Sequence, residues 1–502
     1  MAGLKPRDPA AAAAVTYDLI VIGGGAYGVM LALEAARRRM RPLLLERADF
    51  GGGTTWNHLR IVHGGLRYLQ SLDLDRFRES VEERRWFLRH FPDLVEPLEC
   101  MMPLYGEGLR RMPVMRTALR LNDALSRRRD HGVRADRVLP RSRVIGRAET
   151  ERRFPSVDPH RLRGAAVWHD AVMPSPQRVI IESLRWAESY GARALNYVEA
   201  GRLATSDGRV RGVLAVDRET GDRYEYRAPV VVNCAGPLSG EVAARLDREV
   251  PTLFRPSLAF NLLLDREPLS DSALAVAPRR AGGRTYFMYP WRGRVLAGTY
   301  HAPWFGGARE VEPTADQIGD FLSDLSFAVP GWDLRRDDVL RAFAGLLPAA
   351  VEGTDRLAVR EVLHDHGAAG GPAGLYSMSG VKFTTARAVA EKTLRVVFPR
   401  LSTDPDAHAG TERPLAFRMP EWPEFDAMRQ EDPDGAAALL RRVVEEESVV
   451  HGEDLMLRRS DWGLDPRAPG GTERVVAELL SSDPREAECD PRHLTPAFHR
   501  PL

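Results

Sequence analysis

Residues 52–69, GGTTWNHLRIVHGGLRYL, combine side chains that could bind a polar molecule and act on it chemically. Hydroxyl and amide groups donate and accept hydrogen bonds, an imidazole can carry a proton near neutral pH, and a guanidinium can hold an anion. The glycine-rich backbone at 51–53 adds N–H groups that a ligand can approach closely. We therefore expect a ligand-binding segment built on Thr54, Thr55, Asn57, His63 and Arg67.

The chain before this segment has the order of elements that positions a dinucleotide. YDLIVI at 17–22 is typical of a buried parallel strand, GGGAYG at 23–28 follows directly, and a helical stretch leads to a second apolar run that ends on Glu46. Such glycines let the backbone approach a pyrophosphate at the helix N-terminus, and the acid accepts hydrogen bonds from a ribose. This pattern fits NAD or FAD, and the polar segment favours FAD because FAD extends further and needs more donors.

Composition and charge exclude several classes of protein. With 502 residues the chain is long enough for two or three domains, and its net charge of +1 gives no overall attraction for nucleic acid. Cys100, Cys234 and Cys489 form no CxxC pair, so we expect no metal site and no disulfide framework. No segment approaches the roughly 20 apolar residues of a membrane span. We expect a cytoplasmic protein, or one peripheral on the inner face of the membrane.

Four stretches together resemble the FAD-dependent glycerol-3-phosphate dehydrogenases, within the wider D-amino-acid-oxidase-like superfamily. They are DLIVIGGGAYGVMLALEAARR, LLERADFGGGTT, LRIVHGGLRYLQ and RFRESVEERRWFLRHFPDLVEPL, and the resemblance covers most of residues 16–400. It implies a flavoprotein in which residues 52–65 lie along FAD. The contacts that it implies in this part of the chain are Gly23, Gly25, Gly28, Glu46, Arg47, Thr54, Thr55, Asn57, His63, Gly64, Gly65 and Val198.

Two later segments match the same family. APVVVNCAGPLSGEVA is a strand followed by a small-residue turn at Ala235 and Gly236, and GLYSMSGVKFTTARAVAEK resembles the last FAD segment of the family. The helix that opens there would face the pyrimidine side of the flavin, where negative charge accumulates on reduction. The implied contacts are Gly380, Lys382, Phe383 and Thr384.

The bound FAD is expected to be non-covalent. TTWN also resembles the dimethylglycine and sarcosine dehydrogenases, in which a histidine of the matching turn carries the flavin covalently, whereas this chain has Asn57 there. His58 is adjacent and His63 is near, so a covalent link through either remains an alternative.

The resemblance also implies the fold class and the division into domains. We expect an α/β, two-domain flavoprotein with a Rossmann-like FAD-binding domain, a mixed-sheet substrate domain and a small helical C-terminal region. Residues 15–100, 155–250 and 351–402 would form a discontinuous FAD-binding domain, 101–154 a helical insertion, 251–350 the substrate domain and 403–502 a helical accessory region. The last twenty residues are rich in proline and charge and are expected to be poorly ordered.

The substrate site would combine three of these segments. RTYFMYPWRGRVLAGTYH at 284–301 alternates as two strands joined by an Arg-Gly turn, and it resembles the sheet that covers the flavin in the family. Family members oxidise a secondary alcohol by hydride transfer, with a base for the hydroxyl proton and cations for the phosphate. The candidates for these roles, together with a cation beside the flavin, are His63, Arg67, Lys382 and His301.

Two departures from the family alter the expected substrate. Leu347 stands where the family carries a substrate arginine, and Leu258 stands where it carries a histidine. Loss of a charge-assisted contact to a buried phosphate costs on the order of 2–5 kcal/mol. Glycerol 3-phosphate is therefore a doubtful substrate, and a polyol-, sugar- or lipid-derived alcohol fits better. The candidates to replace the lost cation are Arg255, Arg284 and Arg341.

A basic helix is expected at 109–129, with seven arginines and one aspartate. Leu109, Met112, Met115, Leu119 and Leu121 fall on or near one face of it. Such a helix is typical of a membrane-surface element, and it is also compatible with a solvated helix packed over the FAD domain. The expected electron acceptor is a quinone or oxygen, because no second dinucleotide fingerprint is present and GAAGGPAG at 367–374 lacks the flanking strand and helix.

Two other functions remain open from the sequence. One keeps the flavin but oxidises a CH–NH bond, as amino-acid and N-methyl-amine oxidases do. The other is a membrane-docked binding or assembly protein that retains FAD with a degraded pocket. A screen of alcohols and amines would distinguish both from an alcohol dehydrogenase, because neither would oxidise an alcohol.

Overall fold

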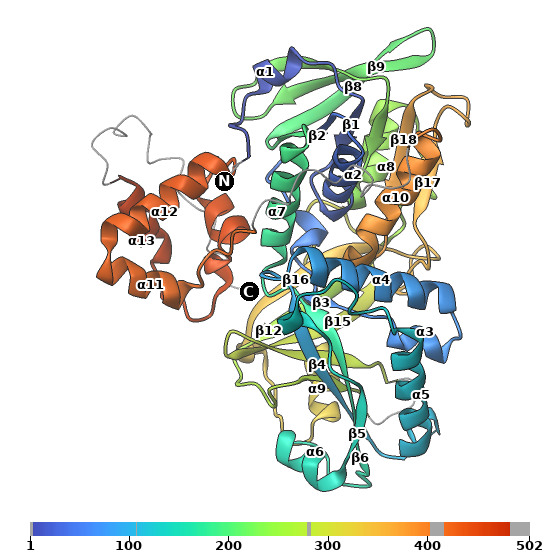
Figure 1. The fold of residues 1–502 in the computed structure, drawn as a ribbon, viewed down its shortest axis with the longest axis vertical. Coiled ribbons are helices and arrows are strands. Elements are labelled where there is room, and N and C mark those ends of the chain that lie inside the picture. The colour runs from blue at the N-terminus through green and yellow to red at the C-terminus, as the bar shows by residue number, and fades with distance from the viewer. Residues whose placement is uncertain (1–3, 107, 279–282, 402–415, 482–502) are drawn as a thin grey trace.

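The computed structural model describes residues 4–106, 108–278, 283–401 and 416–481, and two large sheets organise this part of the chain (Figure 1). No helix of these residues is long and apolar enough to cross a membrane. The same residues contain no cluster of three or more histidine, cysteine, aspartate or glutamate side chains that could hold a metal ion. The predicted disorder of the last twenty residues, and Cys489 among them, lie outside the described residues.

The first sheet forms a Rossmann-like layer. Its elements and the helices and strands that cover it are β1 (Leu19–Ile22), α2 (Ala26–Arg37), β2 (Pro42–Leu45), α7 (Pro176–Ser189), β7 (Arg193–Leu195), β8 (Val198–Ser206), β9 (Arg209–Asp217), β10 (Arg223–Arg227), β11 (Val231–Asn233), α8 (Ser239–Leu246), β17 (Val362–Asp365), β18 (Leu375–Ser379) and α10 (Ala386–Val397). The strand order is β17-β18-β11-β1-β2-β7, with five parallel strands and β17 antiparallel at one edge. Helices α2, α7 and α10 pack together against one face, and the β8-β9-β10 meander packs against the other. This confirms the predicted fold class.

The second sheet is mixed and larger. It contains β3 (Ile61–Val62), β4 (Glu96–Leu104), β5 (Arg143–Gly146), β6 (Gly164–Val172), β12 (Pro256–Leu264), β13 (Ala273–Val276), β14 (Tyr286–Trp291), β15 (Arg294–Pro303) and β16 (Val339–Pro348), and α9 (Ala315–Ala328) packs on it. The strand order is β16-β12-β15-β14-β13-β4-β6-β3, with β5 paired to β6. The predicted hairpin is confirmed, because β14 and β15 pair antiparallel across Arg292 and Gly293. Both turn residues have positive φ, which suits the tight turn of a right-twisted hairpin.

The sheets do not follow the predicted domain boundaries. Strands β3 and β6 and the first half of β4 fall within 15–100 and 155–250, which were assigned to the FAD-binding domain, yet they hydrogen-bond into the second sheet. Likewise 101–154 is not wholly helical, because it includes the end of β4 and all of β5. These pairings join strands that lie far apart in the sequence, so local patterns do not reveal them.

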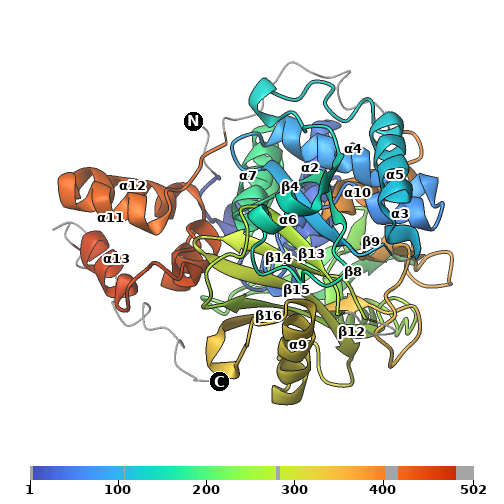
Figure 2. The ribbon, with the colours of Figure 1, turned by 90° about the horizontal axis from the view of Figure 1, so that it is seen from below.

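The remaining helices surround the sheets and form the C-terminal region. They are α1 (Pro9–Ala13), α3 (Leu66–Gln70), α4 (Leu74–His90), α5 (Met112–Leu125), α6 (Arg147–Arg153), α11 (Trp422–Glu431), α12 (Pro433–Glu446) and α13 (Thr472–Ser481). Helices α11 to α13 share a core around Trp422, Phe425 and Trp462 and lie to one side of both sheets (Figure 2). Arg459 of this region binds Asp49 of the Rossmann-like part with two hydrogen bonds, of 2.7 and 2.8 Å.

Candidate functional site

Residues from both sheets and from α5 line one cavity of about 2440 Å³. This volume exceeds the roughly 300–1,000 Å³ of an ordinary small-molecule site, as an extended cofactor together with a substrate would require. Among the predicted catalytic residues and cofactor contacts, Gly28 and Gly64 do not line it. Those that do are Gly23, Gly25, Glu46, Arg47, Thr54, Thr55, Asn57, His63, Gly65, Arg67, Val198, Ala235, Gly236, His301, Gly380, Lys382, Phe383 and Thr384.

The turn between β1 and α2 has the geometry that a dinucleotide needs. A Cβ atom on Gly28 would lie 1.9 Å from the carbonyl oxygen of Gly23, so only glycine lets the helix pack this closely on the strand. Glu46, at the end of β2, accepts hydrogen bonds from the backbone N–H groups of Gly24 at 2.6 Å and Ala48 at 2.8 Å. Burial raises the pKa of Glu46, against these hydrogen bonds, which lower it. Each carboxylate oxygen keeps capacity to accept from a ribose hydroxyl.

Segment 52–65 is held in place by its own polar side chains. The Thr54 hydroxyl donates to the carbonyl of Leu346 at 3.1 Å and accepts from its N–H at 3.2 Å, which joins the segment to β16. The Asn57 amide donates to the carbonyl of Gly53 at 2.9 Å. The predicted cofactor donors Thr54 and Asn57 thus stabilise the segment itself. Thr55 differs, because its hydroxyl accepts from the N–H of Ala26 at 3.0 Å and keeps its own hydrogen for a ligand at the start of α2.

His63 is oriented by a buried carboxylate that the sequence did not reveal. Its Nδ1 lies 3.1 Å from Oδ2 of Asp170 on β6, and Nε2 makes no hydrogen bond with a described residue. Asp170 also accepts from the N–H of Gly64 at 2.7 Å and from Arg84 at 2.8 Å. Burial alone would raise the pKa of Asp170, but the His63 and Arg84 contacts hold it well below its usual range. The buried carboxylate therefore stays charged beside the imidazole.

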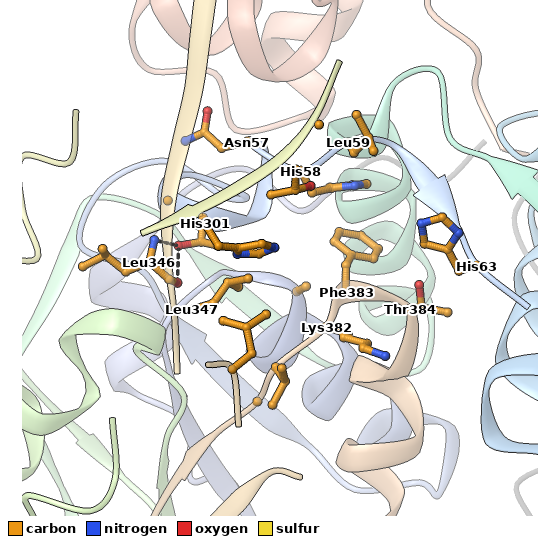
Figure 3. A pocket seen from close by; sticks show the side chains of 18 of the residues that line it. Asn57, His58, Leu59, His63, His301, Leu346, Leu347, Lys382, Phe383 and Thr384 are labelled. Carbon is orange, nitrogen blue, oxygen red and sulfur yellow. Dashed lines mark hydrogen bonds between the residues drawn. The ribbon is translucent and has the colours of Figure 1, made fainter. Parts of the chain in front are cut away.

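Two cations, Arg67 and Lys382, line the cavity, and Figure 3 shows Lys382 on the same side of it as His63. Within the described part of the chain Arg67 has no ion-pair partner, and the Lys382 ammonium lies 4.4 Å from the centre of the Tyr68 ring. Burial, and then the nearby charge of Arg67, lower the pKa of Lys382 to about 8. Tyr27 fixes the backbone of Lys382, because its hydroxyl donates to the Lys382 carbonyl at 2.7 Å and accepts from the N–H at 2.8 Å.

His301 enters the cavity from β15, on another wall (Figure 3). Its Nδ1 is buried and has no hydrogen-bond partner among the described residues. Burial, followed by the positive charge of Arg284, lowers the pKa of His301 to about 4. A neutral imidazole with so low a pKa is a weak proton acceptor, so His301 suits hydrogen bonding better than general-base catalysis.

The wall of the cavity that carries Leu347 is apolar at that position. Leu347 lines the cavity, as expected, but Leu258 does not. Leu258 is fully buried in the core between β12 and α9, so its predicted place in the substrate pocket is wrong. This strand packs under a helix, and an apolar residue there fills the core.

None of the proposed replacement arginines supplies a free cation to this wall. Arg255 donates to the carbonyl of Ala350 at 3.3 Å, and Arg341 lies over the Trp56 ring; neither lines the cavity. Arg284 does line it, but its guanidinium is paired with Asp355. Arg356, which sequence reasoning missed, is an exposed cavity residue without an ion pair among the described residues.

Comparisons with solved structures agree with this architecture. The glycerol-3-phosphate dehydrogenase from Bacillus halodurans, solved in complex with FAD, superposes with a TM-score of 0.70 over 95% of this chain and 93% of that chain, at 20% identity. The L-proline dehydrogenase from P. horikoshii gives a TM-score of 0.53 over 79% of this chain and 99% of that one, at 15% identity. At such identities the likeness shows the fold.

Sequence comparison places the chain more narrowly. It is 29% identical over 410 residues to the mitochondrial glycerol-3-phosphate dehydrogenase of Mus musculus, and 28% identical over 398 residues to the glycerol-3-phosphate dehydrogenase of Synechocystis. The alignments cover 78% and 77% of this chain and 55% and 70% of those relatives, so the chain spans about half the length of the mouse protein. The model of the FAD-dependent oxidoreductase family matches residues 18–394. The chain therefore belongs to the FAD-dependent oxidoreductases.

Proposed function

We propose that the chain oxidises the CH–OH group of a polyol-, sugar- or lipid-derived alcohol. When bound, FAD supplies the hydride acceptor for such a reaction. The observation that carries the proposal is the His63–Asp170 pair, which faces the same cavity as the dinucleotide turn. Alcohol oxidation releases a hydroxyl proton, and this pair is suited to accept it.

His63 is the preferred base because of how Asp170 holds it. In the arrangement that satisfies both groups, Nδ1–H donates to the carboxylate and Nε2 keeps a lone pair. When Nε2 takes up the hydroxyl proton, the buried negative charge of Asp170 stabilises the imidazolium. His301, with its pKa lowered to about 4, is assigned the role of a neutral hydrogen-bonding group at the opposite wall.

The cavity supports a substrate larger or less charged than glycerol 3-phosphate. Arg67 can anchor one anionic or polar group, since it has no ion-pair partner in the described residues. Leu347 presents an alkyl surface where a second cation would be needed for a tightly held phosphate. Arg356, at the exposed rim, is the cation best placed to meet a longer substrate.

Helix α5 supports a membrane-surface location and a quinone as electron acceptor. Met115 and Leu119 are buried against the protein, whereas Val114, Leu121 and Leu125 are 41%, 48% and 45% exposed and share a separate face. Val114 and Leu121 also line the cavity. The arginines of 109–129 without an ion pair to a described residue are Arg110, Arg111, Arg116, Arg120, Arg127 and Arg128. An exposed apolar strip on a helix that also exposes Arg116 and Arg120 suits the surface of an anionic bilayer, from which an apolar acceptor could reach the cavity.

An anaerobic substrate panel tests the proposed reaction. Alcohols with a secondary CH–OH group should bleach the bound flavin, glycerol 3-phosphate should do so weakly, and amines and amino acids should not. Bleaching by amines alone would assign CH–NH oxidation instead. A flavin that no alcohol or amine reduces, in a protein that binds vesicles or a partner, would favour a binding or assembly role.

A further inference from the structure

His58, within segment 52–65, lines the cavity and has one ring nitrogen without a hydrogen-bond partner among the described residues. Its Nδ1 accepts a hydrogen bond from the backbone N–H of Arg60 at 2.8 Å. Its ring packs on Phe383, with 4.9 Å between ring centres. The Nε2 atom is buried and has no hydrogen-bond partner among the described residues. His58 was not assigned a contact from the sequence, where it was considered only as an alternative site of covalent attachment.

The protonation state of His58 follows from these contacts. Burial, together with the charges of Arg60 and His63, lowers the pKa of His58 to about 3, so the ring is neutral at physiological pH. The lone pair of Nδ1 is occupied by the Arg60 N–H, so the single ring hydrogen is on Nε2. A buried N–H without an acceptor is costly, and native structures rarely leave one unpaired. Because His58 lines the cavity, its acceptor is expected on the molecule that fills the cavity.

The order of contacts along the chain indicates which part of that molecule His58 meets. Glu46 is placed for the ribose and Thr55 for the pyrophosphate at the start of α2, whereas His63 is placed for the substrate. His58 lies between Thr55 and His63 in the sequence, and all of these residues line the cavity. The part of FAD between the pyrophosphate and the reacting end is the ribityl chain and the isoalloxazine ring. Contact with Phe383, in the segment that opens α10, favours the ring.

We propose that the Nε2–H of His58 donates a hydrogen bond to a heteroatom at the edge of the isoalloxazine ring, and that this contact strengthens FAD binding and tunes the reduction potential. A neutral donor helps because the ring gains electron density on reduction, so a fixed N–H dipole stabilises the reduced form more than the oxidised form. The same tautomer argues against covalent attachment through His58, because a nucleophilic Nε2 would need the lone pair that its hydrogen occupies.

Three variants test this contact. His58→Leu removes the donor, and His58→Gln keeps a side-chain N–H. His364→Leu is the matched control, because Nε2 of His364 is also buried and unpartnered among the described residues, but His364 does not line the cavity. The readouts are the dissociation constant of FAD from the apoprotein, the midpoint potential of the bound flavin and its visible absorption bands.

His58→Leu should weaken FAD binding about three- to tenfold, the effect of one net hydrogen bond, and should lower the potential and shift the absorption bands. His58→Gln should restore most of each change, and His364→Leu should leave all three unchanged. Unaltered affinity, potential and spectrum in a folded His58→Leu protein would reduce His58 to a packing role. Acid-stable flavin that disappears in His58→Leu would replace the hydrogen bond with a covalent link. If leucine prevents folding, His58→Met provides a second side chain without a donor, and the same criteria apply.

Discussion

Replacing Asp170 with asparagine tests whether the carboxylate serves His63 or only the fold. Asp170 accepts hydrogen bonds from four groups, of Gly64, Arg84, His63 and Trp168, at 2.7, 2.8, 3.1 and 3.3 Å. Breaking a buried ion pair by removing one partner costs about 3–5 kcal/mol. The asparagine oxygen can still accept, and Arg84 keeps its bond to the carbonyl of His169 at 2.8 Å, so we expect about 3 kcal/mol, the lower end of that range.

The same substitution should slow flavin reduction far more than it affects substrate binding. An amide can neither fix the Nδ1–H tautomer of His63 reliably nor stabilise the imidazolium that forms when Nε2 accepts a proton. A positioned general base contributes about 10²–10⁴-fold, so reduction by the best alcohol should fall at least about 10²-fold. Anaerobic stopped-flow absorbance measures this rate directly, apart from reoxidation.

Asp217→Asn provides the matched control for Asp170→Asn. Asp217 is also buried and paired with an arginine, at 2.5 Å from Arg7, but it belongs to the β8-β9-β10 meander and does not line the cavity. It should lose stability without a change in flavin reduction. Equal rates in wild type and Asp170→Asn would refute the reasoning, and so would equal losses of rate in both variants.

The pH dependence of stability provides a second check on Asp170. The pKa of Asp170 is lowered in the folded protein, so its stabilising contribution is present above the unfolded value of about 3.9 and is lost as pH falls through the folded value. The difference in unfolding free energy between wild type and Asp170→Asn should therefore be constant near neutral pH and shrink below about pH 4.

Three further predictions concern the substrate wall, the cavity cations and α5. Leu347→Arg should raise kcat/KM for glycerol 3-phosphate by tens of fold or more. The control is Leu340→Arg, at an exposed position on the same strand but outside the cavity, which should give no gain. If Leu347→Arg also gives no gain, Leu347 does not lie where a substrate phosphate would bind. Sulfate binding, followed through flavin absorbance, should weaken as pH rises through about 8, where Lys382 loses its charge, and this step should be absent in Lys382→Met. Replacing Arg116 and Arg120 with glutamine should weaken binding to anionic vesicles at low salt by about 1 kcal/mol per residue. If the vesicle affinity changes neither with salt nor with the two substitutions, α5 is not the membrane contact.

The parts of the site that the sequence predicted are those encoded within short segments. The glycine turn, its acid Glu46 and the hairpin at 284–301 each depend on neighbours a few residues away, so their patterns are legible in the chain. Asp170 was not predicted because it lies in GAAVWHDAV, whose apolar character indicates only a buried strand. Its role arises from contacts with His63, 107 residues earlier, and Arg84, 86 residues earlier.

The prediction for Leu258 failed for a related reason. The family resemblance identified the position but not the direction of the side chain, and Leu258 shares with Phe260 and Leu262 the face of β12 that packs toward α9. A one-residue difference along a strand reverses the face that a side chain occupies. Asn261, on the same strand, contacts segment 52–65, where its amide donates to the carbonyl of Asn57 at 2.8 Å. The apolar residue belongs to the core, and the polar one supports the cofactor segment.

The C-terminal region extends this dependence on distant contacts to the loop that follows Glu46. Asp49, three residues after Glu46, accepts from Arg459 at 2.7 and 2.8 Å and from Arg458 at 2.9 Å, across more than 400 residues of sequence. Asp49 and Arg459 are fully buried. Moving the C-terminal region away would therefore leave each of the two charges without its partner. The loop that presents Glu46 is thus fixed from both sides, by the glycine turn and by the C-terminal arginines. The glycine turn thus depends on neighbours in the sequence, whereas the loop after Glu46 depends on arginines more than 400 residues away.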